Sequence, residues 1–261
     1  MGAGAQPVMY KILRQPSADP VLHSLCAHTA ARCALAHVRA ASPGLAVAEC
    51  NNHPFAFGRH ALMHNGGVAH FAAIRRRLAL DASAEAMARV LGTTDSELLA
   101  ALVFTLLEER RGPRAWEDAH PVEELRACLE RALQRVLDVQ REVLGPGVAP
   151  DASSLNVCLT DGEQLVAVRF RNHATEHPPS LYLSTTAGVA LNSKFPGHPD
   201  REGEDNGAVN LKAAHEHGAH VIVASEPTTF KEEDWVLIPK NTCVMVGKDM
   251  VVRSSPVNVT F

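Results

Sequence analysis

The sequence lacks the features that mark several common classes of protein. It has no apolar run approaching the roughly 18 residues that span a bilayer, and nothing at its start resembles a secretory signal. Its six cysteines include no C-x-x-C pair. Because disulfides are rare where no export signal accompanies the cysteines, we expect reduced thiols in the cytoplasm.

An excess of positive charge is also missing. The chain carries 25 Lys and Arg against 29 Asp and Glu, for a formal net charge of -4. A mildly acidic chain lacks the excess positive charge that attracts nucleic acid or an anionic membrane. At 261 residues, with 46% hydrophobic and 21% charged residues, it is large enough to bury a sizeable core, and we expect one large α/β unit.

Helical periodicity is present in the middle of the chain. Thr94 is placed to cap a helix, and Glu97 three residues later completes a capping box. The leucines and valines from Leu98 to Leu107 then fall on one face at helical spacing. A second helix is predicted from about Pro121 to Leu144, stopped by the Gly145-Pro146-Gly147 turn.

Strand patterns lie on both sides of these helices. Before them, short strands are predicted at Met9–Leu13, Leu35–Val38 and Ala61–His64, the last closed by a tight Asn65-Gly66-Gly67 turn. After them, Asp161-Gly162 marks a hairpin. The predicted later strands are Leu155–Thr160, Gln164–Arg171, Leu181–Ser184, His220–Ala224, Trp235–Ile238 and Cys243–Val252. Residues 193–218 are polar and Gly-rich and predict a long mobile loop. The pattern favours an α+β sandwich formed by a single domain over 1–261.

Three stretches carry the residues of chemical interest. They are HVRAAS (His37–Ser42), NNHPFAFGRHALMHNGGVAHF (Asn51–Phe71) and TTDSE (Thr93–Glu97). They supply a cation, a Gly-rich turn with an Asn, and a carboxylate at a helix start. Singly, each has an ordinary structural interpretation: a solvated arginine, a turn, and an acid that complements the helix dipole. Together and in this order they are far more specific.

In combination, these motifs resemble the glutamine-binding half of class II glutamine amidotransferases, which belong to the N-terminal-nucleophile hydrolase superfamily. The similarity is greatest to the amidotransferase-like subunit of the fungal glutathione-degradation complex. Later stretches, SLNVCLTDGEQLVAVRF, VIVASEP and EEDWVLIPKNTCVMVG, also resemble that subunit. The resemblance implies an α+β fold, the αββα four-layer sandwich of N-terminal-nucleophile hydrolases. By that comparison the domain is N-terminally incomplete, without its first strand or strands.

The resemblance also implies a role for five residues. Arg39 corresponds to the arginine that binds the α-carboxylate of a glutamyl group, which a planar guanidinium matches bidentately. Asp95 corresponds to the carboxylate that holds the α-ammonium. Asn65, by its side-chain amide, and Gly66, by its backbone N–H, correspond to the oxyanion hole. Ser42 matches a residue that lines the pocket. No cofactor and no metal are implied.

The nucleophile of the family does not match this sequence. In the family, a cysteine exposed by removal of the initiator methionine attacks the γ-carbonyl, with its own α-amine as general base. Here the second residue is Gly2 and the first cysteine is Cys26. We expect the chain as written to be inactive in hydrolysis. It is then either a shortened version of an active enzyme, which we favour, or a catalytically silent relative.

Several functions therefore stay open. The leading hypothesis is a hydrolase of γ-glutamyl amide bonds in glutathione degradation, with glutathione or glutamine as substrate and a peptidase-like partner subunit. A glutaminase that supplies ammonia to another subunit is the second. The third is a silent glutamyl-binding or scaffolding subunit of such a complex. A metal-binding protein is the fourth, suggested by fourteen histidines and the tract His215–His220. No interaction with nucleic acid or membrane is expected.

Overall fold

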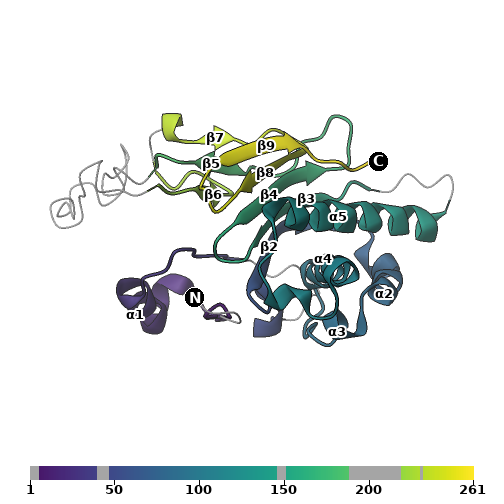
Figure 1. Cartoon of the computed structure of the whole chain (residues 1–261), viewed down its shortest axis with the longest axis horizontal. Coiled ribbons are helices and arrows are strands. Elements are labelled where there is room, and N and C mark those ends of the chain that lie inside the picture. The colour runs from purple at the N-terminus through teal and green to yellow at the C-terminus, as the bar shows by residue number, and fades with distance from the viewer. Residues whose placement is uncertain (1–5, 40–46, 146–150, 188–218, 230–231) are drawn as a thin grey trace.

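The computed structural model describes residues 6–39, 47–145, 151–187, 219–229 and 232–261. In these ranges the chain forms two antiparallel sheets and a layer of helices (Figure 1). The helices cover one face of the larger sheet, and the smaller sheet packs on its other face. The predicted mobile loop at 193–218 lies outside the described residues.

The larger sheet has six strands in the order β1-β2-β3-β4-β8-β9, and the smaller has three in the order β6-β5-β7. All the paired strands are antiparallel. The strands are β1 (Phe55–Phe57), β2 (His60–Gly67), β3 (Ser154–Thr160), β4 (Leu165–Arg171), β5 (Tyr182–Ser184), β6 (Ile222–Ala224), β7 (Val236–Leu237), β8 (Thr242–Val246) and β9 (Val252–Pro256).

The helices precede β3 in the sequence. They are α1 (Pro20–His28), α2 (Phe71–Asp81), α3 (Ala84–Met87), α4 (Asp95–Arg111) and α5 (Val122–Leu144), with short 3-10 turns at Pro16–Ala18, Glu49–Asn51, Ala115–Glu117 and Glu232–Asp234. Helices α4 and α5 lie against the sheet with α2 and α3 beside them, whereas α1 lies apart from this layer (Figure 1). None of the helices in the described part of the chain is long and apolar enough to cross a membrane.

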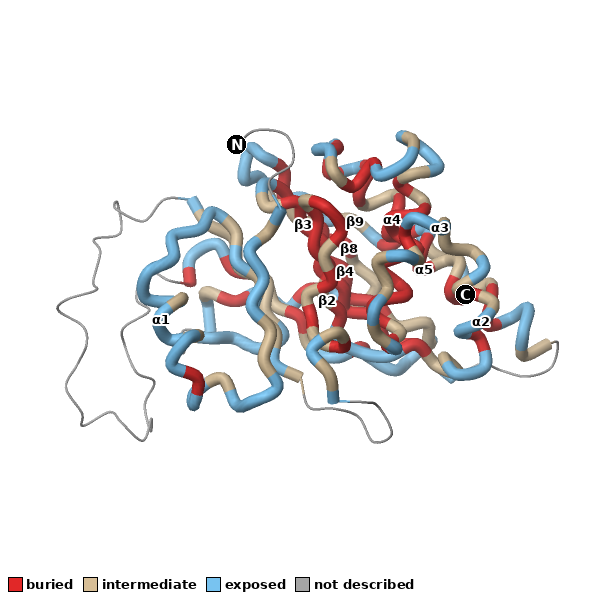
Figure 2. The backbone as a smooth tube through the Cα atoms, turned by 90° about the horizontal axis from the view of Figure 1, so that it is seen from below, coloured by how far each residue is buried: buried red, intermediate tan, exposed pale blue. Residues whose placement is uncertain are grey.

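Side chains on the two faces of the larger sheet form two separate apolar clusters. Val166, Val168 and Phe170 of β4 join the main cluster under the helices, while Ala167 faces the smaller sheet. Because successive side chains of a strand point to opposite faces, one strand serves both layers. Ala167 packs in a second cluster with Leu181, among others. The centre of the molecule, at β2, β3, β4, α4 and α5, is therefore buried, and the N-terminal segment is largely exposed (Figure 2).

The long helices and the central hairpin were predicted correctly. Thr94 caps α4 by accepting a hydrogen bond from the Glu97 amide at 3.2 Å. Glu97 does not close the predicted capping box with Thr94, because its carboxylate accepts from the amides of Leu91 and Gly92 at 2.9 and 2.7 Å. Strands β3 and β4 form the expected hairpin. Val143, in the last turn of α5, is 42% exposed.

Several other predictions were wrong. Met9–Leu13 and Leu35–Val38 form no strand, since neither pairs with a neighbouring strand in the described residues. The region predicted as one strand at Cys243–Val252 is a hairpin of β8 and β9, because the chain turns between Gly247 and Met250, where the Met250 amide donates to the Gly247 carbonyl at 2.9 Å.

The predicted tight turn at Asn65-Gly66-Gly67 is instead the end of strand β2. Asn65 pairs with Asn156, and Gly66 with Leu155, across the β2–β3 ladder. A Cβ at Gly66 would lie 1.9 Å from the Ser154 carbonyl oxygen, and the residue has a φ of +144°. Glycine is thus required for close approach of two strands rather than for a reversal of the chain.

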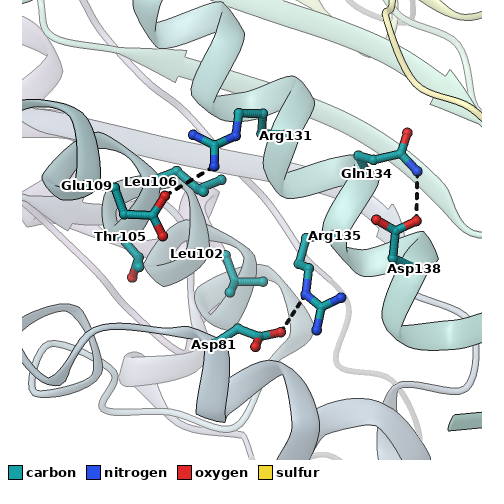
Figure 3. Close-up of a pocket in the computed structure, with 9 residues that line it drawn as sticks. All are labelled: Asp81, Leu102, Thr105, Leu106, Glu109, Arg131, Gln134, Arg135 and Asp138. Carbon is teal, nitrogen blue, oxygen red and sulfur yellow. Dashed lines mark hydrogen bonds and ion pairs between the residues drawn. The ribbon is translucent and has the colours of Figure 1, made fainter. Parts of the chain in front are cut away.

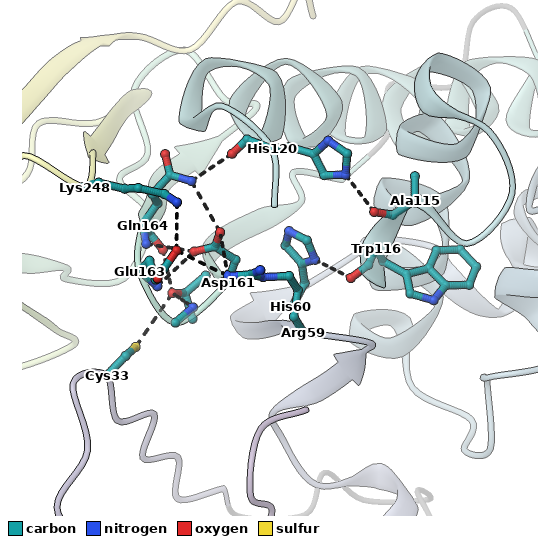
Figure 4. Close-up of polar contacts among 12 residues, drawn as sticks. Cys33, Arg59, His60, Ala115, Trp116, His120, Asp161, Glu163, Gln164 and Lys248 are labelled. Atoms are coloured by element: carbon teal, nitrogen blue, oxygen red, sulfur yellow. Dashed lines mark hydrogen bonds and ion pairs between the residues drawn. The ribbon is translucent and has the colours of Figure 1, made fainter. Parts of the chain in front are cut away.

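The first residue of β2 belongs to a separate polar network (Figure 4). His60 Nδ1 bonds to the carbonyl of Trp116 at 2.8 Å. Nearby, the Gln164 side chain donates to the His120 carbonyl at 2.8 Å, and His120 Nε2 bonds to the carbonyl of Ala115 at 2.7 Å. These bonds attach the β3–β4 hairpin and the start of β2 to the loop between α4 and α5.

Candidate functional site

Asp95 lies at the first turn of α4, beside the last residues of β2. Its Oδ2 accepts a hydrogen bond from the Val68 amide at 2.8 Å, and its Oδ1 accepts from the Ser96 amide at 2.8 Å. An acid at a helix N-terminus is also stabilised by the helix dipole. Residue Asp95 is partly exposed, and the two backbone amides hold its carboxylate in a fixed orientation.

His64 of β2 connects Asp95 to strand β3. The ring is 3% exposed, with Nδ1 at 2.9 Å from Ser96 Oγ and Nε2 at 3.2 Å from the Ser154 carbonyl oxygen. Ser96 Oγ lies 3.1 Å from Asp95 Oδ1. Burial lowers the pKa of His64, and the neighbouring Asp95 carboxylate opposes part of that shift.

Asn65 and Gly66 follow His64 at the exposed end of β2. The Asn65 amide donates to Ser225 Oγ at 3.2 Å, so this side chain connects the larger sheet to the residue after β6. Gly66 lies against the Ser154 carbonyl, with His64 Nε2 3.1 Å from the position of an added Cβ. The predicted oxyanion pair and the contacts of His64 therefore occupy one small region.

Arg39 reaches the same region through Asn51. Its Nη1 donates to the Asn51 carbonyl at 2.9 Å. The Asn51 side chain accepts from the Thr93 amide at 2.8 Å, two residues before Asp95. These two bonds connect Arg39, through Asn51, to the segment that leads into α4 and Asp95. Ser42, the fifth predicted residue, lies outside the described residues.

Two further histidines lie near His64 and Arg39. The rings of His37 and His53 are 4.1 Å apart, and His37 makes a hydrogen bond to the backbone of His64. Neither ring nitrogen of the buried His53 has a hydrogen-bond partner among the described residues. Burial, reinforced by the charges of neighbouring groups that include Arg39, lowers the pKa of His53 to about 2, and burial also lowers that of His37. Both rings are neutral at pH 7.

Sequence reasoning gave no functional role to four residues of this neighbourhood: Asn51, His64, Ser96 and Ser154. His64 and Ser96 both lie inside the motifs, and the HNGG run places His64 directly before the predicted oxyanion pair. Strand alternation could have indicated that His64 and Asn65 point to opposite faces. The contact with Ser154 has no local signal, since the two residues are 90 positions apart.

Three of the six cysteines are buried thiols. Burial raises the pKa of Cys128 to about 11 and those of Cys158 and Cys243 to about 12. These three thiols are therefore protonated at neutral pH, and a thiol is a much poorer nucleophile than a thiolate. Of the others, Cys26 is exposed on α1, and Cys33 Sγ lies 3.7 Å from Thr160 Oγ1.

The described residues hold no group of three or more His, Cys, Asp or Glu that could bind a metal ion. Most of the histidine-rich tract at 215–220 lies outside the described residues. His220, which is described, has its Nε2 at 2.9 Å from the Ala187 carbonyl oxygen.

A pocket of about 350 Å³ lies elsewhere, on the outer surface of α4 and α5 (Figure 3). Its guanidinium groups are already paired: Arg131 with Glu109 at 3.1 Å, and Arg135 with Asp81 at 2.7 Å. None of the predicted site residues lines it. Its charges are satisfied within the protein, so it is a weaker candidate than the region around Asp95.

Comparison with known proteins agrees with the resemblance. The chain is 28% identical over 247 residues to the probable glutamine amidotransferase DUG3 of Saccharomyces cerevisiae, covering 94% of this chain and 66% of that protein. It therefore spans about two thirds of the length of the curated relative that it matches. No family model matches the chain.

Solved structures give the fold. A glutamine aminotransferase class-II domain protein from Silicibacter pomeroyi superimposes with a TM-score of 0.65 and 21% identity, over 98% of this chain and 88% of that one. At that identity the likeness establishes the fold alone. The resemblance seen in the sequence motifs is confirmed: the chain is similar in sequence to a glutamine amidotransferase and has the mixed α/β fold, with antiparallel sheets, of class II glutamine amidotransferase domains.

Proposed function

We propose that this chain is a glutamine amidotransferase-type domain that binds the amino-acid end of a γ-glutamyl compound between Asp95, Arg39 and the end of β2. One observation carries the proposal: the carboxylate of the partly exposed Asp95 is fixed by the Val68 and Ser96 amides, beside the Asn65–Gly66 pair. Asp95 would bind the α-ammonium and Arg39 the α-carboxylate. Ser42 would line the same pocket.

The remaining groups suit transfer chemistry at a γ-amide. The Asn65 amide and the Gly66 N–H would donate to the oxyanion of a tetrahedral intermediate, and losing one such donor costs roughly 2.7–4 kcal/mol of barrier. The Asn65 amide must first exchange its bond to Ser225 Oγ. The reaction we propose is hydrolysis of a γ-glutamyl amide bond, with glutathione or glutamine as substrate.

The attacking group does not come from the cysteines of this chain. An internal cysteine has an amide nitrogen in place of the basic α-amine that an N-terminal nucleophile uses. The three buried thiols are also held protonated at neutral pH. We therefore expect the 261-residue chain to bind γ-glutamyl ligands without releasing glutamate.

Calorimetric titration tests the binding. The wild-type chain is expected to bind L-glutamine but not N-acetyl-L-glutamine, which lacks the α-ammonium group. Asp95→Asn keeps an acceptor for the Val68 amide yet removes the charge, and should weaken glutamine binding at least tenfold, as for loss of one partner of a hydrogen-bonded charge pair. Asp249→Asn, at an exposed ion pair with Arg253, is the matched control and should bind as the wild type does. Equal affinity of Asp95→Asn and wild type would exclude the proposed role.

A catalytically silent glutamyl-binding or scaffolding subunit is the second candidate. The observation that favours it is that the three buried cysteines are held protonated, so none of the three is an activated nucleophile. The test is whether the purified chain releases more glutamate from glutamine or glutathione than a variant without cysteines does. Such release would exclude a catalytically silent subunit. An upstream coding sequence with an in-frame Met-Cys start would favour the active enzyme.

We also propose a partner, a pathway and a cellular location for this chain. A peptidase-like partner subunit, a role in glutathione degradation and a cytoplasmic location are inferred from the family resemblance, and the six free thiols agree with a reducing compartment. We also propose that the domain has the αββα four-layer arrangement.

A further inference from the structure

We propose that His64 is a positioning residue which, through the Ser96 hydroxyl, sets the hydrogen bonding of the Asp95 carboxylate and makes ligand binding there sensitive to pH. The ligand part of this inference rests on the proposed function, because it takes Asp95 as the partner of an α-ammonium group. The link between His64, Ser96 and Asp95 does not depend on any ligand.

The geometry of the His64 ring fixes which nitrogen carries the proton. Nε2 lies 3.2 Å from the Ser154 carbonyl oxygen, which can only accept, so Nε2 bears a hydrogen in every charge state that keeps this contact. In neutral His64, Nδ1 is then a bare acceptor. Its neighbour at 2.9 Å is Ser96 Oγ, whose hydroxyl must donate to it.

A hydroxyl has one hydrogen, and Ser96 has two neighbours that can accept it. While it donates to neutral His64, it cannot also donate to Asp95 Oδ1 at 3.1 Å. When His64 is protonated, Nδ1–H donates to Ser96 Oγ, and the hydroxyl turns to donate to Asp95. One proton gained by His64 therefore adds a hydrogen bond and a nearby positive charge to the Asp95 carboxylate.

Both changes reduce the attraction of Asp95 for a cation. With neutral His64, the carboxylate keeps the two backbone donors, Val68 and Ser96, and its negative charge is available to an α-ammonium group. With protonated His64, the imidazolium compensates that charge at short range in a buried setting, where screening by water is weak. Binding of an ammonium ligand should therefore fall as His64 becomes protonated.

The charged and titratable groups around His64 define the pH window. Asp95 on α4 favours the protonated ring, whereas His37, from the segment before β1, lies beside the His64 backbone. His53 is the third ring of this group. Burial is the largest influence and lowers the pKa of His64 below 6.5. The ring is thus neutral at pH 7, and the change occurs on acidification.

His64 also fixes the position of the predicted oxyanion pair. The Ser154 carbonyl that accepts from Nε2 is the atom against which Gly66 packs. Asn65 and Gly66 follow His64 directly in β2. A single buried ring is therefore attached both to the group proposed to bind the ligand and to the backbone proposed to stabilise the intermediate.

Nitrogen NMR of the histidine rings tests the ligand-free part. In the wild type, neutral His64 is expected as the Nε2–H tautomer. Ser96→Ala should shift the His64 Nδ1 resonance toward that of an unbonded acceptor, and Asp95→Asn should lower the His64 pKa. His60→Gln is the matched control, since His60 is buried on the same face of the same strand but bonds to Trp116. It should leave the His64 resonances unchanged. An Nδ1–H tautomer, or resonances indifferent to Ser96→Ala, would overturn the proposal.

Glutamine affinity measured from about pH 7 downwards, over the range in which the protein stays folded, tests the functional part. Wild type and His60→Gln should lose affinity about three- to tenfold over this range, as expected for one linked proton. Ser96→Ala should bind within about threefold of wild type at pH 7 and lose most of the pH dependence. If Ser96→Ala keeps the pH dependence of the wild type, His64 does not act on Asp95 through the Ser96 hydroxyl. If no form binds glutamine, the proposed function fails, while the NMR result still decides on His64.

Discussion

Strand β2 carries two buried histidines, at its first and fifth residues, and the surroundings of the two rings differ. His60 packs 5.7 Å from the ring of Phe104 and makes one hydrogen bond, to the Trp116 carbonyl. Its Nε2 has no hydrogen-bond partner in the described ranges. His64 has partners for both ring nitrogens. The His60 end of β2 is held mainly by packing, and the His64 end by directed hydrogen bonds.

The same division runs along α4. Its central residues lie in an aromatic cluster, where Phe104 stacks on Phe57 at 4.6 Å and approaches Trp116 at 6.2 Å. Its first turn carries Asp95 and Ser96 in the polar neighbourhood of β2. Packing is non-directional and sets stability, whereas hydrogen bonds orient particular atoms. Mutations at the apolar end, around His60 and Phe104, are therefore expected to change stability. Mutations at the polar end, around His64 and Asp95, are expected to change ligand binding as well.

The largest effect is expected at the apolar end, from Phe104→Ala. Phe104 is 0% exposed, and truncating a buried phenylalanine typically costs about 3–5 kcal/mol of unfolding free energy. Ligand binding at Asp95 should persist as long as the protein is folded. Urea denaturation measures the loss, with Leu91→Ala, at a side chain 78% exposed, as control. A loss below that of the control would contradict the assigned core.

Gly66→Ala, at the polar end, is expected to lower stability somewhat less than Phe104→Ala does. It should also abolish glutamine binding. The new Cβ would lie 1.9 Å from the Ser154 carbonyl oxygen. The two strands must therefore separate, which should lower the free energy of unfolding by about 1–3 kcal/mol. The positive φ adds about 1–2 kcal/mol.

Gly162→Ala is the matched control for this substitution. Gly162 has a φ of +87° with nothing within 4 Å of an added Cβ, so it should show only the backbone cost. Denaturation curves together with glutamine titration separate the two effects. Equal stability of the two variants would show that β2 and β3 do not approach as closely as described.

The third prediction concerns pH and His60. Burial lowers the pKa of His60 from 6.5 to about 4, so the unfolded chain binds a proton that the folded chain rejects. The contribution of His60 to stability is therefore complete above pH 6.5 and is lost as pH falls towards 4, by up to about 3 kcal/mol. His60→Gln should flatten the pH profile of the unfolding free energy over this interval, whereas His23→Gln, at an exposed ring, should not. Parallel profiles for wild type and His60→Gln would contradict it.

Prediction from sequence succeeded where the signal was local and repeated. Helix α4 has a capping threonine and an unbroken apolar stripe, and α5 ends at a glycine with positive φ. Helix α2 was missed because three consecutive arginines interrupt its pattern and it buries only Ile74 and Leu78. Strand β1 was missed because three residues are too few for alternation to be recognised.

Incorrect strand predictions have a related cause. Leu35–Val38 is apolar in sequence, but Val38 is 78% exposed and the segment pairs with no strand among the described residues. A short apolar run can form a strand only beside a partner with free backbone groups. Whether such a partner is in reach is decided by the arrangement of the whole chain.

For the site, the motifs alone predicted the residue types and their order: Arg39, the Asn65–Gly66 pair and Asp95, each within a motif that resembles one family. The sequence also determined the long helices and the central hairpin, because apolar periodicity and turn residues act over a few positions. The contacts of His64 with Ser96, 32 positions away, and with Ser154, 90 positions away, depend on the folded chain. Those contacts depend on the register of β2 against β3 and on where α4 begins, and a register is fixed by the packing of both strands together.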